Sequence, residues 1–204
     1  MDIVPLKTSD FAIAIDCLAA AFAQDPLISH FLPDDAEAKR LALEKMSQGI
    51  LNCSQPDHIY TTAERPKGVA IWSPPEDSEA SLAKLWNLVT SGLLQTPLYL
   101  RWDRLLELVW LLSTVVQMHE RLMPEPHWYL GMLGVSPQCQ GQGIGGRLIQ
   151  PTLELADRSN TPCYLETTTP AAVRFYERHG FQTIHQDFFV GHPYWAMKRS
   201  PQQD

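Results

Sequence analysis

The sequence of 204 residues lacks an apolar run long enough to cross a bilayer. Its longest central segment without formal charge is 108–118, LVWLLSTVVQM, whereas a spanning helix needs about 20 apolar residues. Residues 1–20 also lack the basic start of a secretory signal. We therefore expect a cytoplasmic protein with no membrane partner.

Cysteine is scarce, and its spacing argues against the common cysteine-based sites. The four cysteines form no C-x-x-C pair, and no Cys/His cluster has the spacing of a zinc site. We expect these side chains, Cys17, Cys53, Cys139 and Cys163, to be reduced thiols, and we expect no metal site.

Basic residues are outnumbered, with 16 Lys and Arg against 23 Asp and Glu and a formal net charge of −7. A nucleic-acid partner is therefore not expected, because such proteins are usually basic. Hydrophobic residues make up 45% of the chain and charged residues 19%, so a full core is expected. The length fits one domain over residues 1–204.

The apolar patterns predict strands and helices in alternation, which indicates an α/β or α+β fold. The connection 25–35, DPLISHFLPDD, is rich in turn formers, and Ser9 or Asp10 can cap the first helix. The predicted strands are 2–6, 58–63, 68–73, 127–135, 163–167, 182–190 and 194–199. The predicted helices run to about Phe22, over 36–51, to about Asp157, and from about Pro170.

Residues 76–122 carry Leu and Trp at helical spacing and predict an insertion of two or more helices, separated at Pro97. Trp86, Trp102 and Trp110 fit either of two interpretations, a buried core or the lining of an acceptor cavity. The core is the commoner outcome at this spacing. The insertion itself is expected to line an acceptor site or to form a homodimer contact.

The glycines Gly141, Gly143 and Gly146 have the spacing G-x-G-x-x-G, and Glu166 follows twenty residues later. Glycines before a helix suit a phosphate, because the free N–H groups of the first turn bind anions. The other interpretation is a plain tight turn. A P-loop is excluded, since Arg147 and Leu148 replace Lys-Ser/Thr. A dinucleotide site is disfavoured, because SPQCQ separates the glycines from the strand and few residues follow.

Two motifs together resemble those of the GNAT superfamily of acyl-CoA N-acyltransferases. The segment 140–145, QGQGIG, fits Q/R-x-x-G-x-G/A, and Ala171–Phe181, AAVRFYERHGF, is similar to A-x-x-F-Y-E-x-x-G-F. The C-terminal half is further similar to puromycin N-acetyltransferase-like proteins. The resemblance implies a mixed, mostly antiparallel sheet that splays at the acyl-CoA site, flanked by helices, with acetyl-CoA as the donor.

The resemblance also implies which residues hold coenzyme A. Leu133 and Val135 would pair with the pantetheine arm, and Gly134 suits a bulge or a close backbone approach. Thr169 stands where many members have an Asn that bonds this arm. Arg147 fits a charge near the phosphates or, more commonly, a solvated helix face. The residues implied around the pyrophosphate are Gln140, Gly141, Gln142, Gly143, Ile144, Gly145 and Gly146.

For the chemistry, the resemblance implies direct transfer to an amine without an acyl-enzyme. Tyr176 would protonate the leaving thiolate, with a packed core aromatic as the alternative interpretation. Glu166 is the first choice of base, and His127 and Tyr129 are others. The acceptor is expected to be a small-molecule amine. The alternative functions are a silent acyl-CoA-binding sensor or scaffold and an acetyltransferase for protein amines.

Overall fold

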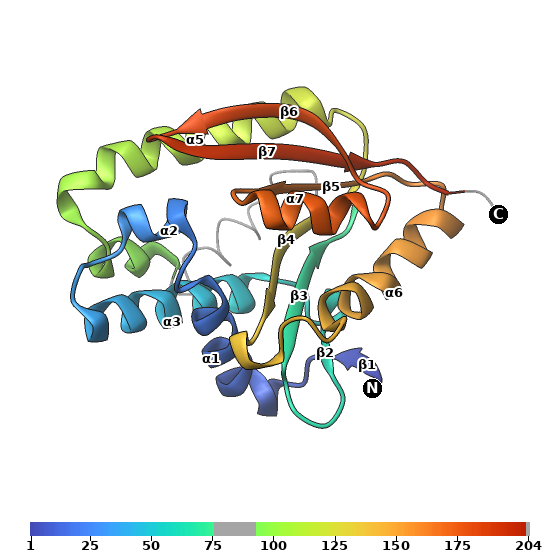
Figure 1. The fold of residues 1–204 in the computed structure, drawn as a ribbon, viewed down its shortest axis with the longest axis horizontal. Helices are drawn as coiled ribbons and strands as arrows, with labels where there is room; N and C mark the ends of the chain where they lie inside the picture. The colour runs from blue at the N-terminus through green and yellow to red at the C-terminus, as the bar shows by residue number, and fades with distance from the viewer. Residues whose placement is uncertain (76–92, 203–204) are drawn as a thin grey trace.

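A computed structural model describes residues 1–75 and 93–202 of the chain. In these residues seven strands form one sheet in the order β1-β2-β3-β4-β5-β7-β6 (Figure 1). All neighbouring strands are antiparallel except β4 and β5, which are parallel. The strands are β1 Ile3–Pro5, β2 Ile59–Thr62, β3 Gly68–Ser73, β4 Trp128–Val135, β5 Cys163–Thr167, β6 Gln182–Phe189 and β7 His192–Arg199.

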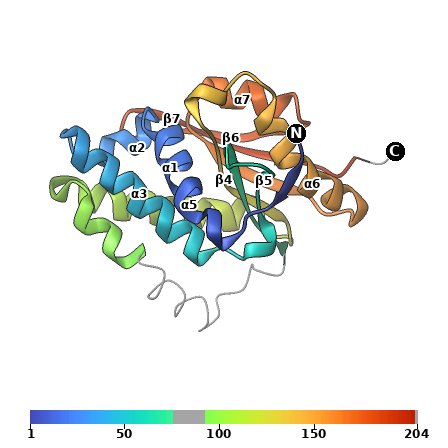
Figure 2. The same ribbon diagram turned by 90° about the horizontal axis from the view of Figure 1, so that it is seen from below.

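Helices cover both faces of the sheet (Figure 2). One face carries α6 and α7, and the opposite face carries α1, α3 and α5. The helices are α1 Phe11–Phe22, α2 Pro26–Phe31, α3 Ala36–Cys53, α5 Leu105–Leu122, α6 Ile144–Arg158 and α7 Pro170–Glu177. We call the first face the α6/α7 face and the second the α1/α5 face.

The predicted fold class is confirmed, and the predicted strands and long helices are present. Two local predictions were wrong. Residues 26–31, predicted as part of a connection, form α2, because Asp25 caps it by accepting a hydrogen bond from the Ile28 N–H at 2.9 Å. Asp10 precedes α1 but makes no side-chain cap bond, since a short 3₁₀ turn, Thr8–Asp10, leads into the helix.

β4 separates from β5 halfway along its length. Their pairing runs from Trp128 opposite Cys163 to Leu130 opposite Leu165 and then stops. Beyond that point β4 continues to Val135 against β3, while β5 continues to Thr167 against β7. The splay expected from the resemblance is therefore present between the later halves of β4 and β5.

A β-bulge lies where this separation begins, and it falls at Gly131. Ile71 pairs with Met132 while Trp72 pairs with Leu130, so Gly131 is the extra residue of β4. The expectation of a bulge at Gly134 was wrong, because Gly134 is in regular register with Val69. The alternative for Gly134, a close approach, is confirmed, since a Cβ there would lie 2.9 Å from Leu18 Cδ2.

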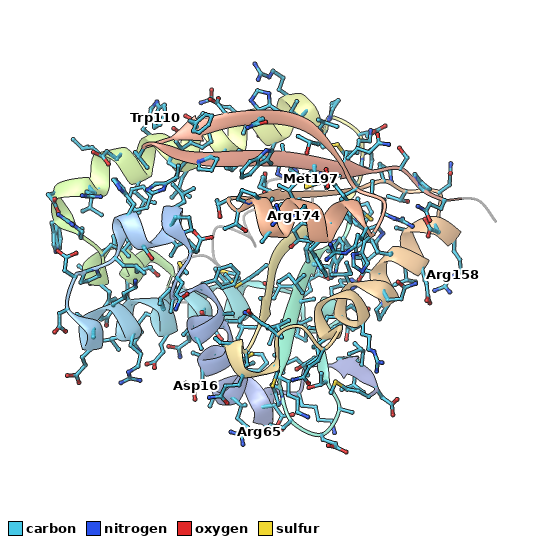
Figure 3. All side chains as sticks on the ribbon, viewed as in Figure 1. Asp16, Arg65, Trp110, Arg158, Arg174 and Met197 are labelled. Carbon is cyan, nitrogen blue, oxygen red and sulfur yellow. The ribbon has the colours of Figure 1, made fainter. Side chains whose placement is uncertain are left out.

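The described part of the predicted insertion contains a 3₁₀ segment, Leu93–Tyr99, with Pro97 inside it, and the helix α5. The core interpretation was wrong for Trp102 and Trp110, which are 67% and 53% exposed. Trp110 lies at the edge of the molecule, near the tip of the β6–β7 hairpin (Figure 3), where its ring contacts Phe189. Trp86 lies outside the described residues.

Candidate active site

The first part of the candidate site is the glycine turn between β4 and α6. Gly141 and Gly143 have φ values of 75° and 73°, a conformation that glycine adopts without strain. A Cβ placed on either would have no atom of the described residues within 4 Å, so both face open space. Gly143 is the N-cap of α6 and no side chain caps this end, so the turn lies directly before the N–H groups that the first turn of a helix leaves without intrahelical partners. The arrangement suits an anionic group.

The next two glycines have a different use. A Cβ on Gly145 would lie 3.2 Å from Phe175 Cζ, and one on Gly146 would lie 2.7 Å from His179 Nε2. Both positions therefore allow α6 to pack closely against α7. Of the glycines predicted to hold a pyrophosphate, only Gly141 and Gly143 face open space, while Gly145 and Gly146 bring the two helices together.

The edge of β4 that faces the splay offers free peptide groups. The Ser136 N–H donates to the Lys67 carbonyl at 2.9 Å, which marks these two residues as a hydrogen-bonded pair of the β3–β4 ladder. By alternation Gly134 also bonds to β3, whereas the peptide groups of Leu133 and Val135 point away from β3 and into the splay. Gln140 Nε2 donates to one of them, the Val135 carbonyl, at 3.1 Å.

Tyr176 lies on α7, on the α6/α7 face of the sheet. It is 7% exposed and packs in one cluster with Leu130, Ile144 and Leu165, and its ring contacts Phe181. Burial raises the pKa of this phenol, so Tyr176 is neutral at physiological pH.

Three residues near the starts of α6 and α7 are local caps or exposed side chains. Thr169 is the N-cap of α7, and its hydroxyl accepts a hydrogen bond from the Ala172 N–H at 3.3 Å. Arg147 is exposed on the first turn of α6, in agreement with a solvated helix face. Gln142 Nε2 reaches back to the Gln138 carbonyl at 3.5 Å and is also exposed.

The second part of the candidate site lies on the opposite face of the sheet. Leu165 belongs to the core of the α6/α7 face, so strand alternation places Tyr164 and Glu166 on the α1/α5 face. The Glu166 side chain is 10% exposed, and its Oε2 accepts a hydrogen bond from the Tyr129 hydroxyl at 2.7 Å. Two of the sequence-predicted residues, Glu166 and Tyr129, are therefore brought together.

Tyrosine hydroxyls surround the Glu166 carboxyl. Burial raises its pKa, and the hydroxyls of Tyr129, Tyr164 and Tyr194 oppose this shift by stabilising the carboxylate. Within the described residues Glu166 Oε1 and the hydroxyls of Tyr164 and Tyr194 are buried without a hydrogen bond of good geometry. Such a group of buried polar atoms is costly unless another partner joins it.

Two histidines extend this cluster from Glu166 toward solvent. His119 Nδ1 lies 3.9 Å from Glu166 Oε1, and His119 Nε2 lies 2.7 Å from His127 Nε2. The His119 ring stacks on the ring of Tyr164 at 4.5 Å. Burial, followed by the neighbouring His127, lowers the pKa of His119 to about 4. Burial also lowers the pKa of His127, so both rings are neutral at pH 7.

His119, Tyr164 and Tyr194 were not predicted as site residues. For Tyr164 a signal was present, because a residue two before Glu166 on a strand lies on the same face. Tyr194 could be placed near Glu166 only from the order of the strands in the sheet. Ala196 pairs with Glu166, and Tyr194 lies two residues from Ala196 on the same face of β7. His119 comes from α5, which no motif links to β5, so no local signal identifies it.

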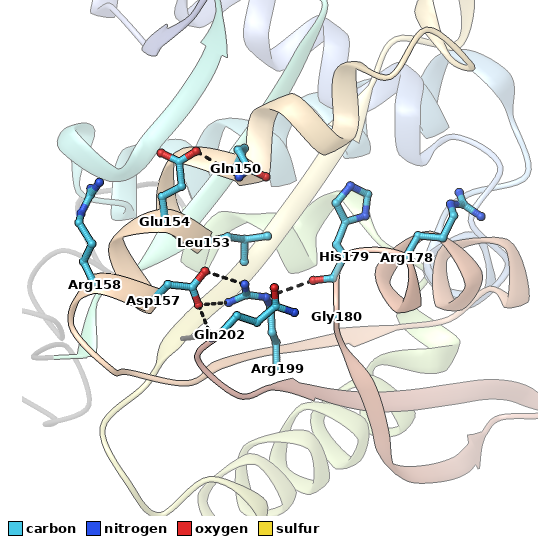
Figure 4. Close-up of a pocket in the computed structure, with 10 residues that line it drawn as sticks. All are labelled: Gln150, Leu153, Glu154, Asp157, Arg158, Arg178, His179, Gly180, Arg199 and Gln202. Carbon is cyan, nitrogen blue, oxygen red and sulfur yellow. Dashed lines mark hydrogen bonds and ion pairs between the residues drawn. The ribbon is translucent and has the colours of Figure 1, made fainter. Parts of the chain in front are cut away.

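A separate recess lies at the far end of α6 (Figure 4). Its floor is an ion pair in which Asp157 accepts two hydrogen bonds of 2.7 Å from Arg199, whose side chain is 4% exposed. Asp157 also accepts from the Gln202 N–H. This pair joins α6 to β7.

Among residues 1–75 and 93–202, no helix has the length and hydropathy of a membrane span, and no group of three or more side chains suits a metal ion.

Comparison with known proteins gives a family match for the segment that contains both motifs. Residues 108–183 match the family model described as acetyltransferase (GNAT) domain. A curated relative, an uncharacterized N-acetyltransferase of Schizosaccharomyces pombe, is 39% identical over 54 residues. That match covers 26% of this chain and 22% of the relative, so it spans about a fifth of the relative's length.

Solved structures match the whole fold. The chain superposes with a TM-score of 0.65 on a Corynebacterium glutamicum structure described as histone acetyltransferase HPA2 and related acetyltransferase. The identity is 21%, covering 99% of this chain and 97% of the other. A polyamine N-acetyltransferase of Drosophila melanogaster gives a TM-score of 0.59 at 18% identity, covering 98% and 100%. At these identities the likeness shows a shared acetyltransferase fold.

Proposed function

We propose that this chain, which has a GNAT domain match and the fold of solved acetyltransferases, is an N-acetyltransferase. It would transfer an acetyl group from acetyl-CoA directly to a primary amine. The observation that carries the proposal is the splay of β4 from β5, because it opens the sheet between the open glycine turn and Tyr176 on one face and buried Glu166 on the other.

In this proposal the α6/α7 face receives the donor. The pyrophosphate lies at Gly141 and Gly143, and the pantetheine arm adds to the β4 edge at the peptide groups of Leu133 and Val135. A backbone N–H of this edge also suits the oxyanion of the tetrahedral intermediate. Tyr176 gives its proton to the departing thiolate, and the phenolate that remains is reprotonated by the second proton that the amine nitrogen loses. A phenol is a weaker acid than a thiol. Tyr176 would therefore give up its proton only once the departing sulfur carries negative charge.

The acceptor amine would approach Glu166 from the α1/α5 face. An alkyl ammonium has a pKa near about 10 and cannot attack until it loses a proton. Glu166 would take that proton, and the raised pKa of its carboxyl brings it closer to a useful base strength. The neutral amine then attacks the thioester through the splay, without a covalent intermediate on the protein.

The test is release of free thiol from acetyl-CoA with a panel of small amines, beside the binding of acetyl-CoA measured by calorimetry. We expect thiol release with at least one amine. Tyr176→Phe should lower kcat by about 10–1000-fold while the Kd for acetyl-CoA stays within about twofold. Wild-type turnover in that variant would remove Tyr176 from the acid role.

The same assay separates the rival functions. Binding of acetyl-CoA without thiol release for any small amine or peptide would favour the sensor or scaffold. Release only with peptide amines would favour an acetyltransferase for protein amines. A small-molecule acceptor is our first choice, and the similarity to puromycin N-acetyltransferase-like proteins makes an antibiotic amine one member of the panel. The Drosophila neighbour, a polyamine N-acetyltransferase, makes a polyamine another member of the panel.

A further inference from the structure

Acetylation of an ammonium by acetyl-CoA releases one proton overall. The ammonium loses two protons to become an amide, and the thiolate, with a pKa near about 8.5, takes only one of them at pH 7. The second proton must reach solvent. Glu166, as the proposed base, is 10% exposed, and the acceptor amine itself would cover its open side.

The hydrogen bonds behind Glu166 have a defined direction. The Glu125 carbonyl can only accept, so the His127 Nδ1 that lies 2.7 Å from it carries a proton. In a neutral ring the His127 Nε2 is then an acceptor. The His119 Nε2, at 2.7 Å from it, must therefore be the donor of that bond.

This direction leaves two acceptors facing each other. His119 Nδ1 has no proton, and it lies 3.9 Å from Glu166 Oε1, which makes no hydrogen bond in the described part of the chain. A proton on Glu166 Oε1 would let this oxygen donate a hydrogen bond to His119 Nδ1. The two atoms would have to move closer together or be bridged by one water molecule. The arrangement is poised to receive the proton that Glu166 takes from an amine.

We propose that His119 and His127 form a relay that carries a proton from Glu166 to solvent beside Glu125. The relay rests on the proposed function. The Glu166 O–H bond breaks as His119 Nδ1–H forms, the His119 Nε2–H bond breaks as His127 Nε2–H forms, and His127 Nδ1–H passes its proton to water. Each ring then returns to its starting tautomer by exchange with water: His119 loses its Nδ1 proton and gains one on Nε2, and His127 loses its Nε2 proton and gains one on Nδ1.

The solvent end of the relay is open and charged. His127 itself is 9% exposed, but Glu125 is exposed on the connection from α5 to β4 and pairs with Lys198 of β7. A proton that leaves His127 therefore enters water next to a carboxylate. The titratable and charged groups that face the two rings are Glu125, Tyr129, Tyr164, Glu166 and Lys198.

The relay is tested by His119→Gln and His127→Gln, with His185→Gln as the matched control. His185 lies on edge strand β6 beside Asp187, with Ala196 of β7 between it and Glu166 in the sheet. Each relay variant should lower kcat about 10–100-fold at pH 7 and leave KM for the amine and the Kd for acetyl-CoA within about twofold. The double variant should lose no more than the single variants, because the two rings act in series.

The pH profile distinguishes a relay from a structural role. The loss should shrink toward pH 9–10, where a larger share of the amine is already neutral, and added imidazole should restore part of it at pH 7. A loss that is equal at all pH values, or that appears in KM and the Kd, would overturn the relay. Full activity of His119→Gln at pH 7 would overturn it as well.

Failure of the proposed function is recognised separately, because wild-type protein would then release no thiol. In that case nitrogen-15 shifts of the histidine rings decide the relay. We expect a protonated Nδ1 on His127, a protonated Nε2 on His119, and a change in the His119 shifts in His127→Gln. A His119 ring that titrates near its ordinary pKa and ignores His127→Gln would contradict the relay.

Discussion

The two faces of the sheet at the splay have opposite character. On the α6/α7 face the glycine turn is open and the single hydroxyl of Tyr176 lies in an apolar core. On the α1/α5 face a carboxyl, three tyrosines and two histidines are buried together. A thioester needs a dry channel and one proton, whereas an ammonium needs a base and an exit for a proton. The difference matches the two substrates of the proposed reaction.

The faces also differ in how they are held. Asp157 and Arg199 fasten α6 to β7 through two hydrogen bonds on the α6/α7 face, away from the splay. The polar cluster on the α1/α5 face instead has buried atoms that make no hydrogen bond within the described residues. The first arrangement stabilises the fold, whereas the second costs stability, as is common at functional sites.

The largest effect is expected from Asp157→Ala, which removes the partner of a buried guanidinium. An unpaired buried charge costs about 3–5 kcal/mol, so the free energy of unfolding in urea should fall by that amount. Glu154→Ala is the control, since Glu154 is exposed one turn earlier on α6. If folded protein at low temperature keeps wild-type kcat, Asp157 acts on stability alone. A loss below 1 kcal/mol would contradict the account.

Gly143→Ala tests whether the pyrophosphate of acetyl-CoA lies at the glycine turn. A Cβ there would meet no atom of the described residues, so it would crowd only a bound pyrophosphate. The Kd for acetyl-CoA should rise about 10–100-fold, equivalent to about 1.4–2.7 kcal/mol. Calorimetry with coenzyme A measures this directly.

Gly191→Ala is the matched control for that variant. Gly191 has a φ of 82° and equal space for a Cβ, but it lies in the turn between β6 and β7. Both variants pay about 1–2 kcal/mol for a non-glycine residue in this conformation, so their stability losses should agree. Equal Kd values in the two variants would place the pyrophosphate elsewhere.

Glu166→Gln tests how much stability the buried carboxyl on the α1/α5 face costs. The pKa of Glu166 is raised in the folded protein. At low pH the carboxyl is protonated in both states and costs no stability. As pH rises through the folded pKa, the buried carboxyl must ionise, and this ionisation lowers the free energy of unfolding. The melting temperature of Glu166→Gln, relative to that of the wild-type protein, should therefore rise from pH 4 to pH 8. Each kcal/mol of penalty removed corresponds to about 2–4 °C. Glu154→Gln should show no such trend, and a trend of the opposite sign would contradict the burial argument.

The α6/α7 face could be predicted from the sequence, and the α1/α5 face only in part. The glycine turn, β5 and α7 lie close together in the chain, so a spacing pattern records their arrangement. The cluster around Glu166 joins α5, β4, β5 and β7, and its geometry depends on sheet order. The bulge at Gly131 was also beyond a local pattern, because it is defined by the pairing of Ile71 and Trp72 on another strand.

The smallest effect is expected at Thr169, where the GNAT proteins that the chain resembles often have Asn. Thr169 caps α7, and Asn is at least as good an N-cap, so Thr169→Asn should change stability by only a few tenths of a kcal/mol. Its longer amide should reach the pantetheine arm and tighten acetyl-CoA binding by about two- to fivefold. Thr169→Ala is the control and should lose about 1 kcal/mol of stability with the cap. If Thr169→Asn binds acetyl-CoA no more tightly than wild type, the arm does not pass this residue, and the contact implied by the resemblance is absent in this chain.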